Sequence, residues 1–284
     1  MDSLDINSKK SLHIRSNSLP SRQHPIVAQV EENLCRLKSS EATSSTFSLC
    51  YRLNNLQDLH DSINKLLLLP STQQTLVHES GNKWADDLLE GSLRLLDLCD
   101  IAKDALLQTR ECIHELESDL RRRRSEKIIT SDVQKCLKSR KMIKKTVQKA
   151  LKGIKISSQK SEESSATVSL LKEVEAITYS TVESVMSNVV GPKLPSKFSP
   201  WSLVSKLVQS KRVASHDEDA NANEVEMVGA TLNSIASHTT DKSFNLQDLL
   251  RKSESSIQDF EEDLESLYRH LIKNRVSLLN ILNN

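Results

Sequence analysis

The chain has 284 residues, of which 39 are Lys or Arg and 38 are Asp or Glu, and only 3% are aromatic. It contains five glycines and six prolines, which is few for this length. Sheet proteins need both residue types at their many turns, whereas helix interiors exclude them. The composition therefore argues against a β-rich fold and favours a few long helices.

The first 25 residues are polar and show no sustained apolar periodicity. We predict that 1–25 form a disordered tail. Apolar residues then recur on one helical face over 26–37, and a second stripe of this kind runs over 49–67. Each stripe predicts an amphipathic helix. Pro70 ends the second helix, because a proline ring disrupts a helix interior.

Ser71 and Gln74 have the spacing of a capping box and predict a short helix that ends near Gly81. The longest apolar stripe follows over 84–120 and has the period of a single helix. Gly91 lies on the apolar face of that stripe. It indicates either the close approach of a neighbouring helix or a kink, and the sequence leaves both readings open.

Four more helices are predicted in the second half of the chain. A basic helix follows a cap at Ser131, another helix spans 162–190, a short one begins at Ser199 and Pro200, and the last begins at a cap provided by Asn245. Two segments between them are predicted linkers, 191–200 because it holds three of the six prolines and 214–244 because it is polar.

Together these elements predict an all-α fold, an elongated antiparallel helical bundle with long coiled-coil-like helices. We assign the bundle to a single domain over 26–284, preceded by the tail.

Five cysteines form no C-x-x-C pair, and most lie beside Leu or Ile in a helical stripe. We predict reduced thiols in the core, without disulfides, and hence a reducing compartment.

Sequence motifs for catalysis are missing. No phosphate-binding glycine loop, nucleophile elbow or H-E-x-x-H pattern occurs. Glu111 and His114 form one Glu-x-x-His element, but a di-iron bundle needs two such elements and two more glutamates. We therefore expect no catalytic, cofactor-binding or metal-binding residues, and no enzymatic activity.

The charge is unevenly distributed. Residues 121–155 carry 14 Lys and Arg and two acids, a net +12, whereas 215–284 carry 13 acids and six Lys and Arg, a net −7. Either the two segments neutralise each other, or the basic one forms a surface for anionic lipid or an acidic partner. Nucleic acid is disfavoured, since no aromatic residue is interleaved for base stacking. The candidate basic surface comprises Arg121, Arg122, Arg123, Arg124, Lys138, Lys141, Lys144, Lys145 and Lys149.

The tail contains a candidate phosphorylation motif, Arg15-Ser16-Asn17-Ser18-Leu19-Pro20. It matches R-S-x-S-x-P, the pattern that 14-3-3 proteins bind once the second serine is phosphorylated. Arg15 also suits a basophilic kinase, and the phosphate on Ser18 would offer charge and acceptor oxygens to an Arg cluster. Pro20 would turn the chain out of the binding groove. An unrecognised polar tail is the alternative.

The sequence shows no apolar signal region and no run long enough to span a membrane. We expect a cytoplasmic protein that is not secreted. The alternatives are a peripheral location on a membrane and, through a nuclear-import-like patch at Arg121 to Arg124, a partly nuclear one.

Several blocks resemble the plant-specific BYPASS-like family, domain of unknown function 241: HIRSNSLPSRQHPIVAQV, RLNNLQDLHDSINKLLLLPSTQQTL, LLEGSLRLLDLCDIAKDAL and SLYRHLIKNRVSLLNIL. The resemblance runs from about residue 12 to 282. It implies a plant protein with a helical fold and a role connected with root and shoot development, and it supplies no catalytic residues.

We expect a non-enzymatic regulatory or interaction protein. The alternative is a peripheral membrane protein that binds anionic lipid through 121–155. Partner identity and oligomeric state stay open.

Overall fold

The computed structural model describes residues 24–40, 45–78, 84–122, 126–153, 165–190, 227–229, 231–232 and 243–283. Residues 1–23, which include the Ser18 motif, and the predicted linker 191–200 lie outside these residues. Of the predicted linker 214–244, only 227–229, 231–232 and 243–244 are described. Within them every regular element is a helix and there is no strand, which confirms the all-α prediction. The helices are α1 (Pro25–Ser39), α2 (Thr46–Leu67), α3 (Pro70–His78), α4 (Trp84–Arg121), α5 (Glu126–Gly153), α6 (Ala166–Val190) and α9 (Ser243–Leu282).

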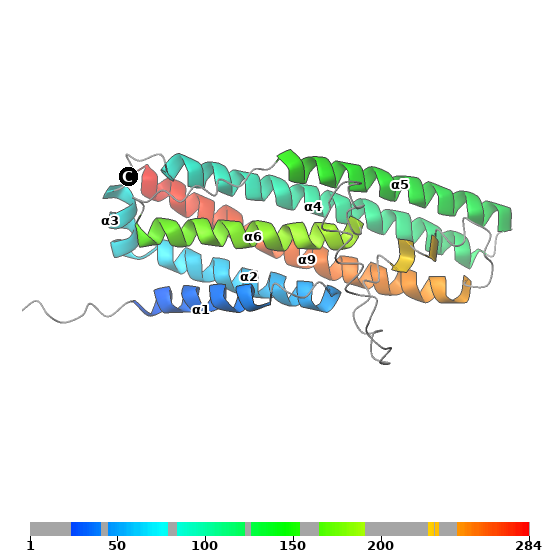
Figure 1. Cartoon of the computed structure of the whole chain (residues 1–284), viewed down its shortest axis with the longest axis horizontal. Helices are drawn as coiled ribbons and strands as arrows, with labels where there is room; N and C mark the ends of the chain where they lie inside the picture. Colours follow the sequence, from blue (N-terminus) through cyan, green and yellow to red (C-terminus); the bar gives the residue numbers. More distant parts are fainter. Residues whose placement is uncertain are drawn as a thin grey trace, which may run out of the picture.

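Four long helices surround the core. α9 packs between α2 and α4 on one side, and α6 packs against the same two helices on the other. α1 lies outside against α2, and α5 lies outside against α4 and α6 (Figure 1). α1, α2, α4, α5 and α6 alternate in direction along the chain (Figure 1), as expected of an antiparallel bundle. Coiled-coil packing and an elongated overall shape stay predictions.

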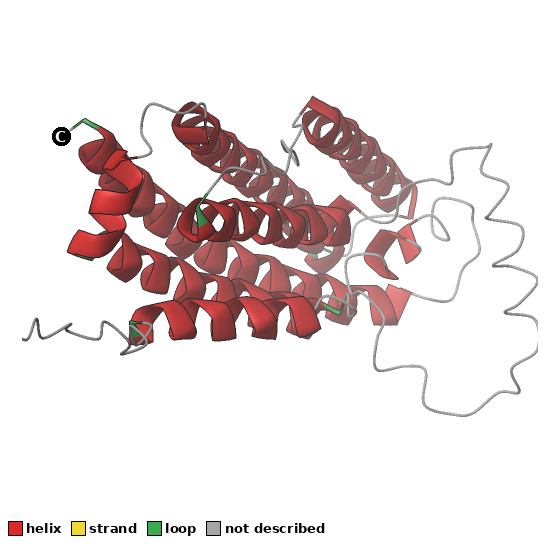
Figure 2. Cartoon of the chain, turned by 60° about the vertical axis from the view of Figure 1, so that its left-hand side comes forward, coloured by secondary structure: helices red, strands yellow, loops and turns green. Residues whose placement is uncertain are grey.

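A single apolar core joins these helices. Figure 2 shows the helices of the bundle from a second direction. Leu53 of α2, Leu98 of α4, Val182 of α6 and Leu264 of α9 are all fully buried. Burying such a side chain contributes roughly 1.5–3 kcal/mol of favourable transfer free energy. Leucines at helical spacing therefore supply most of the core, as the low aromatic content requires.

The predicted helix positions agree with the structure, but three predicted caps are wrong. α3 begins at Pro70, so Ser71 is its second residue; proline suits the first helical position, where its missing N–H is not needed. α5 begins at Glu126, so Ser131 lies inside the helix. Nothing between 126 and 131 breaks a helix, and extending an existing helix costs little. α9 also begins two residues before Asn245, at Ser243.

Gly91 allows a close approach. α4 continues through this residue, and a Cβ atom there would overlap the carboxylate of Glu175 on α6. The side chain of Glu175 is only 15% exposed, and its carboxylate lies 3.9 Å from the Arg94 guanidinium. Burial raises the pKa of Glu175. The glycine therefore makes room for a carboxylate between α4 and α6.

Candidate binding surface

The outer side of α5 carries a row of exposed lysines, which we call the lysine face: Lys138, Lys141, Lys145, Lys149 and Lys152. Their spacings of three and four residues keep them within an arc of about 80° around the helix. None of these five lysines has an ion-pair partner in the part of the chain that the structure describes. Met142 is 66% exposed and lies at the edge of the row.

The opposite side of α5 is apolar and buried. Val133, Ile143 and Val147 are each at most 4% exposed and belong to the common core. Because this side packs against α4 and α6, it fixes which side of the helix faces outward. The apolar stripe thus orients the lysine face.

The other predicted basic residues are placed differently. Lys144 is half-buried at the border of the apolar side. Arg121 is exposed but donates to Glu117 over 2.6 Å, and Arg122 lies 4.0 Å from Asp119. Arg123 and Arg124 lie outside the residues that the structure describes. Of the predicted surface, Lys138, Lys141, Lys145 and Lys149 form one continuous row.

Ion pairs join α9 to α4. Two α9 carboxylates contact α4 cations, Glu265 at 2.5 Å from Lys103 and Glu261 at 2.9 Å from Arg110. In the opposite sense, Arg251 of α9 lies 3.2 Å from Glu117 of α4. α5 lies on the far side of α4 from α9 (Figure 1). In the described segments, the lysine face is therefore not neutralised by the acidic C-terminal helix.

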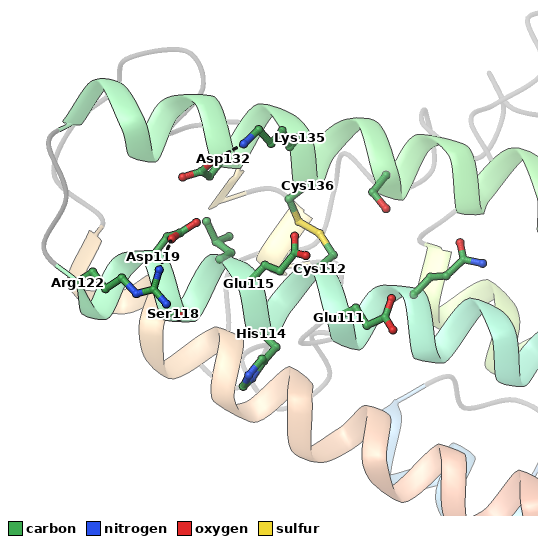
Figure 3. Close-up of a pocket in the computed structure, with 13 residues that line it drawn as sticks. Glu111, Cys112, His114, Glu115, Ser118, Asp119, Arg122, Asp132, Lys135 and Cys136 are labelled. Carbon is green, nitrogen blue, oxygen red and sulfur yellow. Dashed lines mark hydrogen bonds and ion pairs between the residues drawn. A yellow bond between two sulfur atoms is a disulfide. The ribbon is translucent and has the colours of Figure 1, made fainter.

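A groove of about 490 Å³ separates part of α4 from α5, and a disulfide crosses it (Figure 3). Cys112 and Cys136 are bonded, with their Cα atoms 5.6 Å apart. The prediction of reduced cysteines without disulfides is wrong for this pair. The two residues are 24 positions apart in the sequence, and only the antiparallel packing of α5 against α4 brings them opposite each other. A search for local cysteine pairs misses such a contact.

A buried hydrogen-bond cluster lies at the centre of the bundle. His60 Nε2 is 2.9 Å from Thr178 Oγ1, whose hydroxyl already donates to the Val174 carbonyl. Nε2 must therefore donate, and Nδ1 accepts from Asn274 Nδ2 at 3.0 Å. Burial, and to a smaller extent the charge of His270, lowers the pKa of His60 to about 3. The ring is neutral and its two nitrogens are both used within the fold.

A small cavity of about 50 Å³ adjoins this cluster and is otherwise lined mostly by Leu, Ile and Val. Its volume suits a few waters at most. Asn274 Oδ1 lies at this cavity and has no hydrogen-bond partner among the residues described. A water is the simplest partner for this acceptor, so the cluster is best understood as part of the core.

One group of possible metal ligands occurs among the residues described, formed by His114, Glu117 and Glu254. It does not include Glu111. Both Glu111 and His114 line the groove, and the His114 side chain points toward α9 (Figure 3). Glu117 accepts from both Arg121 and Arg251. Both guanidinium groups bind Glu117 Oε1, and their positive charges would repel a cation there, so these residues fit an ion-pair cluster better than a metal site.

The comparison with protein-family models assigns the chain to a family. The family model for protein BPS1 matches residues 52–281, most of the chain. The chain belongs to the BPS1 family. This assignment agrees with the resemblance to BYPASS-like proteins. The comparisons with curated proteins and with solved structures found no match. The BPS1-family match covers α2 to α9, including the lysine face.

None of the described helices combines the length and the apolar content that crossing a bilayer requires. The cytoplasmic, peripheral and nuclear locations considered from the sequence stay predictions.

Proposed function

We propose that this BPS1-family chain is a non-catalytic binding protein that docks on an anionic membrane surface through the lysine face of α5. The observation that carries the proposal is the lysine face on the outside of the bundle, whose five lysines have no ion-pair partner among the residues that the structure describes. As the BYPASS-like resemblance implies, we propose a plant regulatory protein connected with root and shoot development.

The shape and composition of the row favour a membrane over other anionic partners. Five lysines lie along one straight helix edge, which can approach a flat layer of headgroups without changing shape. Met142 adds an exposed apolar side chain beside Lys141 and Lys145. No aromatic residue occurs on α5, so base stacking has no support. An acidic protein is the alternative partner.

The buried polar groups support a role without catalysis. Hydrogen bonds within the fold engage His60, and arginines engage Glu117. The cavity next to His60 is of water size.

Vesicle co-sedimentation tests the membrane proposal. We expect the full chain to bind vesicles that contain phosphatidylserine, and not vesicles of phosphatidylcholine alone, with affinity that falls as salt rises. Lys141→Glu with Lys145→Glu should weaken binding about tenfold or more, because each change replaces attraction by repulsion.

A matched control uses two exposed lysines of α9. Lys252→Glu with Lys273→Glu changes the net charge by the same amount away from the lysine face, and it should alter binding by no more than about twofold. Equal weakening by both double variants would show that net charge, and not this surface, drives association. No binding to either vesicle would overturn the membrane proposal in favour of an acidic protein partner.

We further propose that phosphorylated Ser18 recruits a 14-3-3 protein, with Arg15, Ser16 and Pro20 as the surrounding motif. Support comes from the sequence alone, since the motif lies outside the described residues. Capture of 14-3-3 by the phosphorylated chain, compared with Ser18→Ala, tests it. We expect capture to be lost in the variant and retained in Ser11→Ala, a nearby control. Equal capture by Ser18→Ala would refute the assignment.

A further inference from the structure

The disulfide between α4 and α5 can be reached from solvent. Cys112 and Cys136 are 8% and 5% exposed, and both line the groove of about 490 Å³. Figure 3 shows the bond crossing between the two helices inside this groove. A small organic thiol fits such a space, so attack on the bond does not require the bundle to open.

The groove also has a charge preference. Four carboxylates line it, those of Glu111, Glu115, Asp119 and Asp132, and two cations, those of Arg122 and Lys135. The lining therefore carries a net charge of −2. A concave site of one charge sign concentrates small ions of the opposite sign and repels those of the same sign. Access to the disulfide should therefore depend on the charge of the incoming thiol.

We propose that Cys112–Cys136 is a thiol–disulfide exchange site that reacts with small cationic thiols in preference to anionic ones, and that its state controls how firmly α5 is held on α4.

The exchange follows ordinary thiol chemistry. A small thiolate attacks one of the two sulfurs, an S–S bond forms to the attacking sulfur, and the other cysteine leaves as a thiolate that takes a proton from water. A second small thiolate then attacks the sulfur of the bound small molecule. The two small thiols leave as a disulfide, and the second cysteine is released as a thiolate that takes a proton from water. Two electrons pass to the protein, which ends with two thiols. The small disulfide is the oxidant in the reverse direction.

α4 and α5 are joined by the backbone at one end, and the disulfide adds a side-chain cross-link between them. Opening the bond would remove that cross-link. α5 lies on the outside of the bundle and would then be held by the packing of Val133, Ile143 and Val147. A consequence for vesicle binding rests on the proposed function, whereas the exchange reaction itself does not.

Cys99 provides an internal control. It is fully buried, and burial raises the pKa of its thiol to about 12. Since the thiolate is the reactive species, Cys99 should resist alkylation in the folded protein while the opened pair reacts.

The test compares three thiols on the full chain: cysteamine, 2-mercaptoethanol and 3-mercaptopropionate. Opening is followed by alkylation and peptide mass spectrometry at Cys112 and Cys136. Each rate is divided by the rate for the same thiol in denaturing urea, which removes differences in intrinsic reactivity. We expect the ratio for cysteamine to exceed that for 3-mercaptopropionate about fivefold at low salt, and the difference to shrink at high salt.

Glu115→Gln should reduce the preference for cysteamine over 3-mercaptopropionate, because it removes one carboxylate from the groove. Equal ratios for the three thiols, or opening only after global unfolding, would overturn the exchange site.

Hydrogen exchange tests the second half of the inference. Amides in the first half of α5 should exchange at least about fivefold faster in the reduced chain and in Cys112→Ser with Cys136→Ser than in the oxidised chain. Amides of α2 should not change. Unchanged exchange in α5 would show that the bond does not hold the helix. Both measurements are made without vesicles, so their failure is distinct from failure of the membrane proposal.

Discussion

His60 is a residue whose environment keeps it neutral. Its ring is fully buried, donates to Thr178 and accepts from Asn274, an arrangement that has no place for a second ring proton. The cost of charging this ring falls on the folded state alone, because the unfolded chain exposes it to water. A single position thus couples the stability of the whole bundle to pH.

We predict that acid destabilises the protein through His60. Its pKa is about 3 in the folded state and near 6.5 when unfolded, so the unfolded chain binds more protons between these values. Stability is fully present above pH 6.5 and falls as the pH drops toward 3, by about 2 kcal/mol at pH 5. Urea denaturation at pH 7 and pH 5 measures this, and His60→Gln should reduce the loss. If His60→Gln loses as much stability between pH 7 and pH 5 as the unmodified chain, the loss comes from other titratable groups.

Gly91 gives a second prediction at this scale. Alanine normally favours a helix interior by about 1 kcal/mol over glycine. Here a methyl group would overlap the carboxylate of Glu175, which lies at the end of a flexible side chain and can shift to make room. We expect the cost of that shift to offset the gain in helix propensity, so that Gly91→Ala changes the free energy of unfolding by less than about 1 kcal/mol. In a Glu175→Ala background, Gly91→Ala should stabilise the chain by about 1 kcal/mol in urea denaturation. Equal stabilisation in both backgrounds would contradict the close approach.

At the scale of the helices, the sequence predicts positions better than ends. Apolar periodicity located α2, α4, α6 and α9, because a stripe of many residues averages out local exceptions. The ends depend on a few residues with weak preferences. Ser71 and Ser131 both have capping-box spacing, yet a proline and an uninterrupted helical stretch start these helices earlier.

Two serines allow a test of the helix starts: Ser45, which caps α2, and Ser131, which was predicted as a cap but lies inside α5. Ser45 accepts from the Ser48 N–H at the start of α2. We expect Ser45→Ala to lower the free energy of unfolding by about 1 kcal/mol. Ser131→Ala, inside α5 and exposed, should be neutral or slightly stabilising. Thermal and urea denaturation of both variants measure the difference, and a similar loss in each would contradict the observed helix starts.

For the whole molecule, the distribution of charge depends on which helices touch. The sequence shows a basic and an acidic segment but not whether they meet. The fold pairs acidic α9 with α4 through Lys103, Arg110 and Glu117, and leaves α5 on the outside. The groove and its disulfide were missed for the same reason, since Cys112 and Cys136 meet only in the folded antiparallel pair. Among the candidate basic residues, the row of exposed lysines was predictable because helical spacing alone aligns Lys138, Lys141, Lys145 and Lys149.

The most direct measurement of the central claim is lysine acetylation of the full chain with and without phosphatidylserine vesicles, read residue by residue by mass spectrometry. We predict that vesicles slow modification of Lys138, Lys141, Lys145, Lys149 and Lys152 at least about threefold, as expected for side chains held against anionic headgroups. Lys252 and Lys273 on α9 should be modified at unchanged rates. Unchanged rates on α5, or protection that is greatest on α9, would contradict the account.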